Sequence, residues 1–265
     1  MKLGQILAYA ILLLSHSAQA FTLNNSVGAS FPQKVVKVNV AAHTCVNLGI
    51  SNQALLDMTA EAVNQYWNTA PASRLQLEPG SLVSVSDSFR TDNGCQSATG
   101  SCNPNPNLVV ASEILISCNI DSAAVKNFSN GVLAVTIPNN ISGSNIKGAL
   151  ILVNDTASNG FRSKAHDEQV AILAHEIGHG IGLGHSPVID SLMYYSSIPT
   201  RRSLGEDDMD GIHFLYPTEQ PIKGCGTIAD ISNMSGPGSF FLSFILGLLL
   251  CAILLSRPWA KRNRN

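Results

Sequence analysis

The stretch HEIGHGIGLGH, residues 175–185, decides how the rest of the sequence is interpreted. On a helix, His175 and His179 lie four residues apart, so their imidazole rings project from the same face. Two neutral imidazoles in that arrangement can bind one zinc ion at about 2.0–2.1 Å. Glu176 is rotated by about 100° from His175, which keeps it out of the ligand set but within reach of a metal-bound water. The pattern therefore predicts a catalytic zinc site with Glu176 as general base.

The third predicted ligand is His185, which a continuous helix would carry roughly 9 Å further along the axis than His179. The chain must therefore leave the helix and turn back, and Gly182 can adopt the positive φ that such a turn needs. A buried helix with incidental histidines is one alternative, and the length of the pattern HExxHxxGxxH disfavours it. A purely structural zinc site is another, but it would need a fourth protein ligand instead of Glu176.

The first residues of the chain resemble a targeting segment. Residues 1–20 contain a lysine at position 2, a short apolar stretch and a final Ala-Gln-Ala, which is typical of a secretory signal peptide. Cleavage after Ala20 would leave Phe21 as the new N-terminus. A membrane anchor is the alternative, and the shortness of the apolar run disfavours it. We therefore expect the protein to be exported and to act at the cell surface or outside the cell.

The last residues predict membrane attachment. Residues 239–256 form an uncharged apolar run of about one membrane span. Residues 257–265 are basic, which favours the cytoplasmic side for the tail and the outside for the body. We expect a folded domain over residues 21–220 and a linker over residues 221–238.

Cysteines and net charge limit the classes of protein further. An oxidising compartment would let the four cysteines of the exported body pair. Four cysteines allow three pairings, and we favour Cys95–Cys102, which closes a small loop, with Cys45–Cys118 tying two strands. The formal net charge is −2. There is no basic stripe of the kind that binds nucleic acid, so no nucleic-acid partner is expected.

Periodicity of apolar residues predicts the main elements. We expect strands at 34–40, at 107–118, at 131–138 and at 146–154, and a strand–turn–strand unit at 74–86. We expect helices at 51–70, 165–182 and 203–216, and a turn-rich loop at 89–107. The last helix would begin with a capping box formed by Ser203 and Glu206. Because strands and helices do not alternate regularly, the fold class is α+β.

The motif, with the serine that follows it, resembles the zinc motif of the metzincin metallopeptidases. Ser186 points to the matrixin branch, because astacin-like members tend to have Glu at that position and adamalysin-like members Asp. The stretch SLMYY, residues 191–195, resembles the Met-turn of these enzymes, with Met193 as an apolar floor beneath the zinc ligands. The resemblance covers about residues 30–217 and is specific at 175–193.

The stretch LGEDDMDGIHFLYP, residues 204–217, resembles the matrixin C-terminal helix. In that helix, paired aspartates corresponding to Asp207 and Asp208 tie the helix to the Met-turn and sometimes to the mature N-terminus. The resemblance implies a metzincin-like zincin fold: a twisted, mostly parallel sheet with one antiparallel edge strand, an active-site helix, a Met-turn and a C-terminal helix. The edge strand would be residues 131–138, and an extended peptide substrate could add to it.

The resemblance also implies a function. The protein would be a zinc endopeptidase that hydrolyses peptide bonds of extracellular proteins, with Glu176 activating a zinc-bound water. The alternative is a surface-anchored binding module that holds zinc and cleaves nothing. Calcium is a further expected ligand, at loop residues such as Asp155, although no EF-hand spacing is present. The second, structural zinc cluster of animal matrixins is not evident.

Two departures from the family pattern carry hypotheses. The common Met-Tyr-Pro is replaced by Met193-Tyr194-Tyr195. In astacin- and serralysin-like relatives a tyrosine two positions after the Met can ligate zinc and then swing to stabilise the oxyanion, and Tyr195 holds that position. A pocket-lining aromatic is the alternative.

The second departure is the tail. The stretch GCG at 224–226, the apolar run and the basic end resemble bacterial C-terminal sorting signals of the MYXO-CTERM and JDVT-CTERM kind. Cys225 would then be the modified residue. A plain single-span anchor with a spare thiol is the alternative.

Overall fold

A computed structural model describes residues 21–96, 102–122, 126–128, 131–196 and 201–218. The strands are β1 (Val35–Ala41), β2 (Gln76–Val83), β3 (Glu113–Asn119), β4 (Ala134–Ser142) and β5 (Asn145–Asn154). The helices are α2 (Asn52–Gln65), α3 (Ser88–Thr91), α4 (His166–Gly180) and α5 (Glu206–Leu215). Short 3-10 turns lie at Trp67–Thr69, Pro106–Leu108 and Phe161–Ser163.

The five strands form one sheet in the order β2-β1-β3-β5-β4. Strands β2, β1, β3 and β5 are parallel to one another, and β4 runs antiparallel to β5 at the edge. The mostly parallel sheet expected from the sequence is therefore present, and its antiparallel edge strand includes most of residues 131–138. Strand β5 is buried along nearly its whole length, as a central strand covered on both faces must be.

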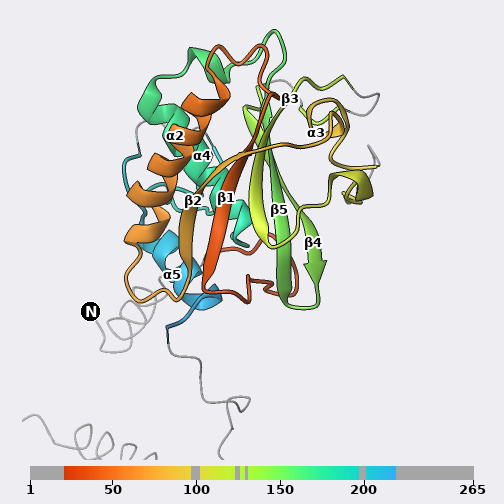
Figure 1. Ribbon diagram of the computed structural model, residues 1–265. Helices are drawn as coiled ribbons and strands as arrows, with labels where there is room; N and C mark the ends of the chain where they lie inside the picture. The colour runs from red at the N-terminus through yellow and green to blue at the C-terminus, as the bar shows by residue number, and fades with distance from the viewer. Residues whose placement is uncertain (1–20, 97–101, 123–125, 129–130, 197–200, 219–265) are drawn as a thin grey trace, which may run out of the picture. The chain divides into compact units, whose positions relative to one another are not determined.

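Helices α2 and α4 cover one face of the sheet, as Figure 1 shows. The larger apolar core lies between them and the strands and includes Trp67, whose indole Nε1 donates to the carbonyl of Ala174 in α4 at 2.8 Å. A smaller apolar cluster lies on the opposite face, where Phe89 of α3 packs with Leu115 and Leu150. The sheet is thus buried on both sides, and α4 packs against β4 and β5.

Both predicted disulfides are present. Cys95 is bonded to Cys102, and Cys45 is bonded to Cys118. Cys118 lies in β3, whereas Cys45 lies in the loop after β1, so the second bond ties that loop rather than a strand to the sheet.

The strand–turn–strand unit expected at 74–86 was wrong, because a single strand, β2, runs through Pro79 and Gly80. An edge strand tolerates proline, and the pairing with β1 shifts register between Val38 and Val40 at this point. A side chain at position 80 would lie 1.9 Å from Oδ1 of Asn39, so glycine serves close packing there rather than a turn.

The other elements differ from expectation mainly at their ends. The helix expected at 51–70 ends at Gln65 and is followed by the 3-10 turn Trp67–Thr69. The loop expected at 89–107 contains the end of α3 and the beginning of a 3-10 turn. The capping box predicted for Ser203 and Glu206 was wrong. The N-cap of α5 is Gly205, two residues after the predicted N-cap Ser203, and the helix begins at Glu206.

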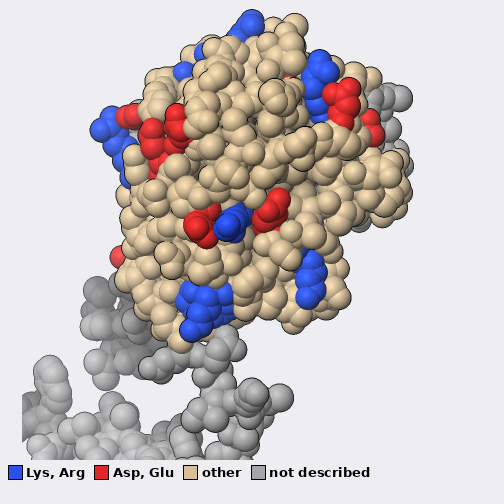
Figure 2. Space-filling view, in the orientation of Figure 1, with Lys and Arg blue, Asp and Glu red and all other residues tan. Residues whose placement is uncertain are grey.

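The chain divides into two units after Thr218. The predicted signal peptide, linker with Cys225, apolar span and basic tail lie outside the described residues. Within the residues that are described, no helix is long and apolar enough to cross a membrane. On the face of the molecule drawn in Figure 2, acidic and basic side chains are interspersed in small groups rather than gathered by sign.

Candidate active site

Helix α4 carries the first two predicted ligands. It begins after Ala165, whose backbone N–H donates to Glu168 at 3.2 Å, and its apolar face packs into the core. The helix ends at Gly180, and Gly182 has a φ of +111°. That left-handed conformation turns the chain back, as expected, and brings His185 beside the ligands on the helix.

The three histidines form one group. Their ring centroids lie 4.8, 5.5 and 4.7 Å apart for the pairs 175–179, 175–185 and 179–185. Their ligating nitrogens all lie within 4.8 Å of one another, and in the described part of the chain they are the only such cluster of His, Cys, Asp or Glu. Small side-chain rotations would bring the three nitrogens to the spacing that one tetrahedral zinc requires.

Two of the imidazoles are oriented by backbone carbonyls. Nδ1 of His175 lies 2.7 Å from the carbonyl oxygen of Leu192, and Nδ1 of His179 lies 2.8 Å from that of Leu183. With Nδ1 as the donor in each pair, Nε2 is left with a free lone pair for a metal. Burial lowers the pKa of His179 to about 3, and burial also lowers the pKa of His185. Neutral imidazoles are the form that binds zinc, so these residues fit the metal.

Glu176 lies beside the histidines and is buried. Burial raises the pKa of its carboxyl, against the lowering effects of His175 and of a hydrogen bond from Thr136. The hydroxyl Oγ1 of Thr136, on β4, lies 2.6 Å from Oε2 of Glu176 and 2.9 Å from its carbonyl oxygen. The contact of Thr136 was not predicted from the sequence, because no local pattern links residues that are 40 positions apart.

Met193 lies beneath this part of α4. It is buried, and a Cβ at Gly178 would lie 2.3 Å from its sulfur and 2.6 Å from the ring of Trp67. Glycine at position 178 therefore lets the turn at Met193 and the core approach the helix closely. The predicted apolar floor is present, and it explains one of the glycines that are unfavourable in a helix interior.

The buried carboxylate of Asp208 holds that turn in place. It accepts hydrogen bonds from the hydroxyl of Ser191 at 2.5 Å and from the backbone N–H groups of Leu192 and Met193 at 2.6 and 3.0 Å. It also accepts from the N–H of Gly205 at 2.8 Å, which caps α5. One side chain thus fixes both the turn and the start of the helix, which is why α5 begins later than predicted.

Asp207 has a different environment. Its Oδ2 is buried and has no hydrogen-bond partner among the described residues. Phe21, the residue expected at the mature N-terminus, packs against Phe214 of the same helix with ring centroids 5.3 Å apart. This packing brings Phe21 to the helix that carries Asp207.

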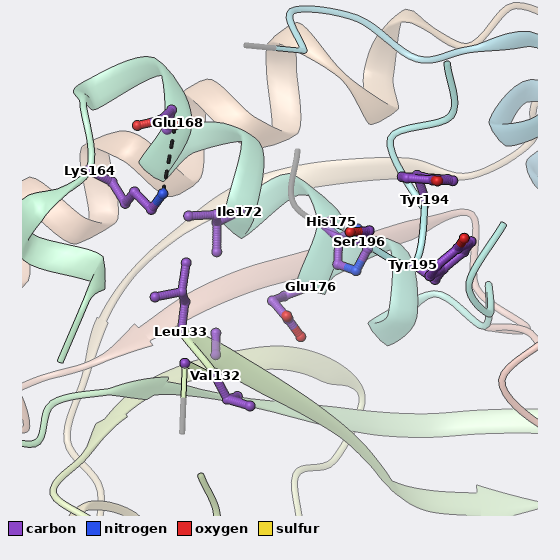
Figure 3. A pocket seen from close by; sticks show the side chains of 12 residues that line it. Val132, Leu133, Lys164, Glu168, Ile172, His175, Glu176, Tyr194, Tyr195 and Ser196 are labelled. Carbon is purple, nitrogen blue, oxygen red and sulfur yellow. Dashed lines mark ion pairs between the residues drawn. The ribbon is translucent and has the colours of Figure 1, made fainter. Parts of the chain in front are cut away.

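A cavity of about 400 Å³ runs past His175 and Glu176, as Figure 3 shows. At one end lies the ion pair of Lys164 and Glu168, with 3.8 Å between charged atoms. The middle is lined by apolar side chains, among them Leu133 and Ile172. At the other end lie His175, Glu176, Tyr194, Tyr195 and Ser196.

Tyr195 is 63% exposed and lines this cavity together with His175. Its backbone N–H donates to the carbonyl of Ser186 at 3.2 Å, which places it beside the loop that carries His185.

Asp155 is the residue that the sequence suggested for calcium. It accepts backbone hydrogen bonds from Val46 at 2.7 Å and from Asn47 at 2.8 Å. Its carboxylate therefore anchors the loop that contains Cys45.

Comparison with known proteins finds a family that is similar to this part of the chain. Residues 113–217 match the model of the matrixin family. The matrixin match begins at β3 and extends past α5, so it contains the three histidines, Glu176, Met193 and Asp208. It supports a matrixin-type metallopeptidase.

Matrixin relatives match over a shorter segment. An interstitial collagenase of Sus scrofa is 46% identical over 57 residues, which cover 21% of this chain and 12% of the relative. Metalloendoproteinase 2-MMP of Arabidopsis thaliana is 44% identical over 59 residues, covering 22% and 15%. Stromelysin-1 of Rattus norvegicus is 48% identical over 56 residues, covering 19% and 12%. The matched segment is thus a small part of each of these relatives.

Proposed function

We propose that this protein is an exported zinc endopeptidase that hydrolyses peptide bonds of extracellular proteins. The observation that carries the proposal is the placement of Glu176 beside three clustered imidazoles, in a cavity under the edge strand β4. The match of residues 113–217 to the matrixins supports the same reaction class.

His175, His179 and His185 would hold the zinc. When bound, zinc polarises a peptide carbonyl and makes a water molecule more acidic. The protein's own part in the chemistry is proton transfer at Glu176, which accepts a proton at its carboxylate and then delivers it to the leaving amine. The position of Glu176 supports this role, because its buried side chain lies beside the three histidines and borders the cavity.

The sheet supplies a binding surface for an extended substrate. Strand β4 pairs with β5 on one side only, so its other edge presents backbone N–H and C=O groups. A peptide that adds as a further strand would satisfy these groups and lie across the cavity. One of its side chains would enter the cavity between Leu133 and Ile172, toward the ion pair of Lys164 and Glu168.

Location and further ligands complete the proposal. The two disulfides suit an oxidising compartment outside the cytoplasm. We retain the signal peptide of residues 1–20, the membrane span of residues 239–256 and the bacterial sorting tail around Cys225 as sequence-based proposals. Calcium binding is a further sequence-based proposal, although the described position of Asp155 gives it no support.

Exchange of Glu176 tests the proposed reaction. Glu176→Ala in the purified full chain should retain stoichiometric zinc and lose peptide cleavage by at least about 100-fold, because general-base catalysis typically contributes that much. Zinc would be measured by elemental analysis and cleavage with a peptide library, with and without a chelator. A wild-type chain that holds zinc and cleaves no library peptide would instead favour the binding module, and a chain without zinc would refute both.

A further inference from the structure

Residues 22–24 lie directly on the loop that carries the third histidine. Leu23 forms an antiparallel bridge with Leu183. The N–H of Gly184 donates to the carbonyl of Thr22 at 2.8 Å, and the N–H of Asn24 donates to the carbonyl of Gly182 at 3.1 Å. A segment that is distant in sequence thus pairs with the whole stretch between Gly182 and His185.

Two side chains of this segment reach the zinc ligands themselves. Oγ1 of Thr22 donates to the backbone carbonyl of His185 at 2.6 Å. The amide Nδ2 of Asn24 donates to the backbone carbonyl of His179. Glycine at position 184 makes the contact with Thr22 sterically feasible, since a Cβ there would lie 2.4 Å from that hydroxyl oxygen.

His185 has particular need of such support. The rings of His175 and His179 are held through Nδ1, whereas the ring of His185 has no hydrogen bond within the described residues and is exposed. The position of the His185 ring must therefore be set by the backbone that carries it. Thr22 contacts that backbone twice: its carbonyl accepts from the N–H of Gly184, and its hydroxyl donates to the carbonyl of His185. Partners that orient metal ligands through the ring N–H typically change metal affinity by about 10- to 100-fold, and we expect a partner of the ligand's backbone to act in the same direction at the lower end of that range.

We propose that Thr22 and Asn24 are positioning residues of the zinc site, and that the segment following the signal peptide completes the site by fixing His185. The inference rests on the proposed zinc function. The N-terminal segment lies outside the matrixin match. The inference gives this segment a role in binding a metal whose ligands lie more than 150 residues later in the chain.

The test uses the full chain and zinc alone as the probe. Thr22→Val removes the hydroxyl and keeps the shape, so zinc affinity measured by chelator competition should fall about 10-fold. Thr22→Ser keeps the donor and should restore affinity. Thr91→Val is the matched control, because the Thr91 hydroxyl also lies within hydrogen-bond distance of acceptors, Oδ1 of Asp92 at 2.9 Å and the carbonyl of Asp87 at 3.2 Å, but is on α3.

A second measurement separates positioning from general stability. The metal-free Thr22→Val chain should unfold at nearly the same denaturant concentration as the Thr91→Val chain. In a His185→Ala background, Thr22→Val should change zinc affinity less than about twofold, because the ligand it positions is gone. Equal zinc affinity of wild type and Thr22→Val, or an equal loss in both backgrounds, would overturn the inference. Absence of zinc from the wild type would overturn the proposed function first.

Discussion

The hydroxyl of Thr136 on β4 donates to the carboxylate of Glu176 on α4, with 2.6 Å between Oγ1 and Oε2. The edge strand therefore contacts the proposed general base as well as forming the rim of the cavity. Thr136→Val should lower kcat/KM about 10-fold, since a hydrogen bond to a charged group contributes roughly 1.5–3 kcal/mol. Thr136→Ser should retain most activity. Peptide hydrolysis at saturating zinc measures the effect, and unchanged kinetics in Thr136→Val would show that Glu176 is oriented without it.

Tyr195 lines the same cavity as His175 and Glu176. If its hydroxyl stabilises the oxyanion, Tyr195→Phe should lower kcat by about 10-fold or more while KM changes little. Tyr194→Phe is the control, because the neighbouring ring lies 4.5 Å away between centroids and also borders the cavity. Equal effects of the two substitutions would assign Tyr195 to the wall of the pocket only.

The charge at the far end of the cavity should affect the choice of substrate. Lys164 faces Glu168, which also caps α4 through Ala165 and is therefore the less mobile partner. A long side chain with an apolar stem and an oxygen at its tip, such as glutamine or glutamate, would be preferred. Lys164→Glu should shift kcat/KM toward lysine and arginine by about fivefold, the size expected for a half-exposed charge. A peptide series varied at this one position measures the shift, and an unchanged ranking would place the substrate side chain elsewhere.

Asp208 is predicted to contribute most of the stability of the turn at Met193. Asp208→Asn replaces one accepting oxygen by a donor and leaves buried N–H groups unpaired, which should cost about 2–4 kcal/mol in the free energy of unfolding. Asp210→Asn is the control on the same helix, because Asp210 is exposed. Denaturant unfolding of both variants measures the difference. A loss below about 1 kcal/mol in Asp208→Asn would contradict the role of this carboxylate.

The clustering of the three histidines was predictable from the sequence because its geometry is local. His175 and His179 share a helix face through the period of the helix, and Gly182 permits the turn that returns His185. The wrong predictions arose where local signals have two meanings. Pro79 and Gly80 indicate a turn in the sequence but lie within an edge strand. Ser203 and Glu206 have the spacing of a capping box, but the helix is capped instead by Asp208, which accepts from the N–H of Gly205.

By itself the sequence predicted the group of three histidines with Glu176 next to it in the chain, the two disulfide pairings and the order of most elements, because each depends on short spacings or on few alternatives. The tertiary structure alone decided that Thr136 contacts Glu176 and that Thr22 contacts His185. These contacts join residues from separate elements. Their partners are set by the order of the strands and the packing of α4 against the sheet, which no local periodicity encodes.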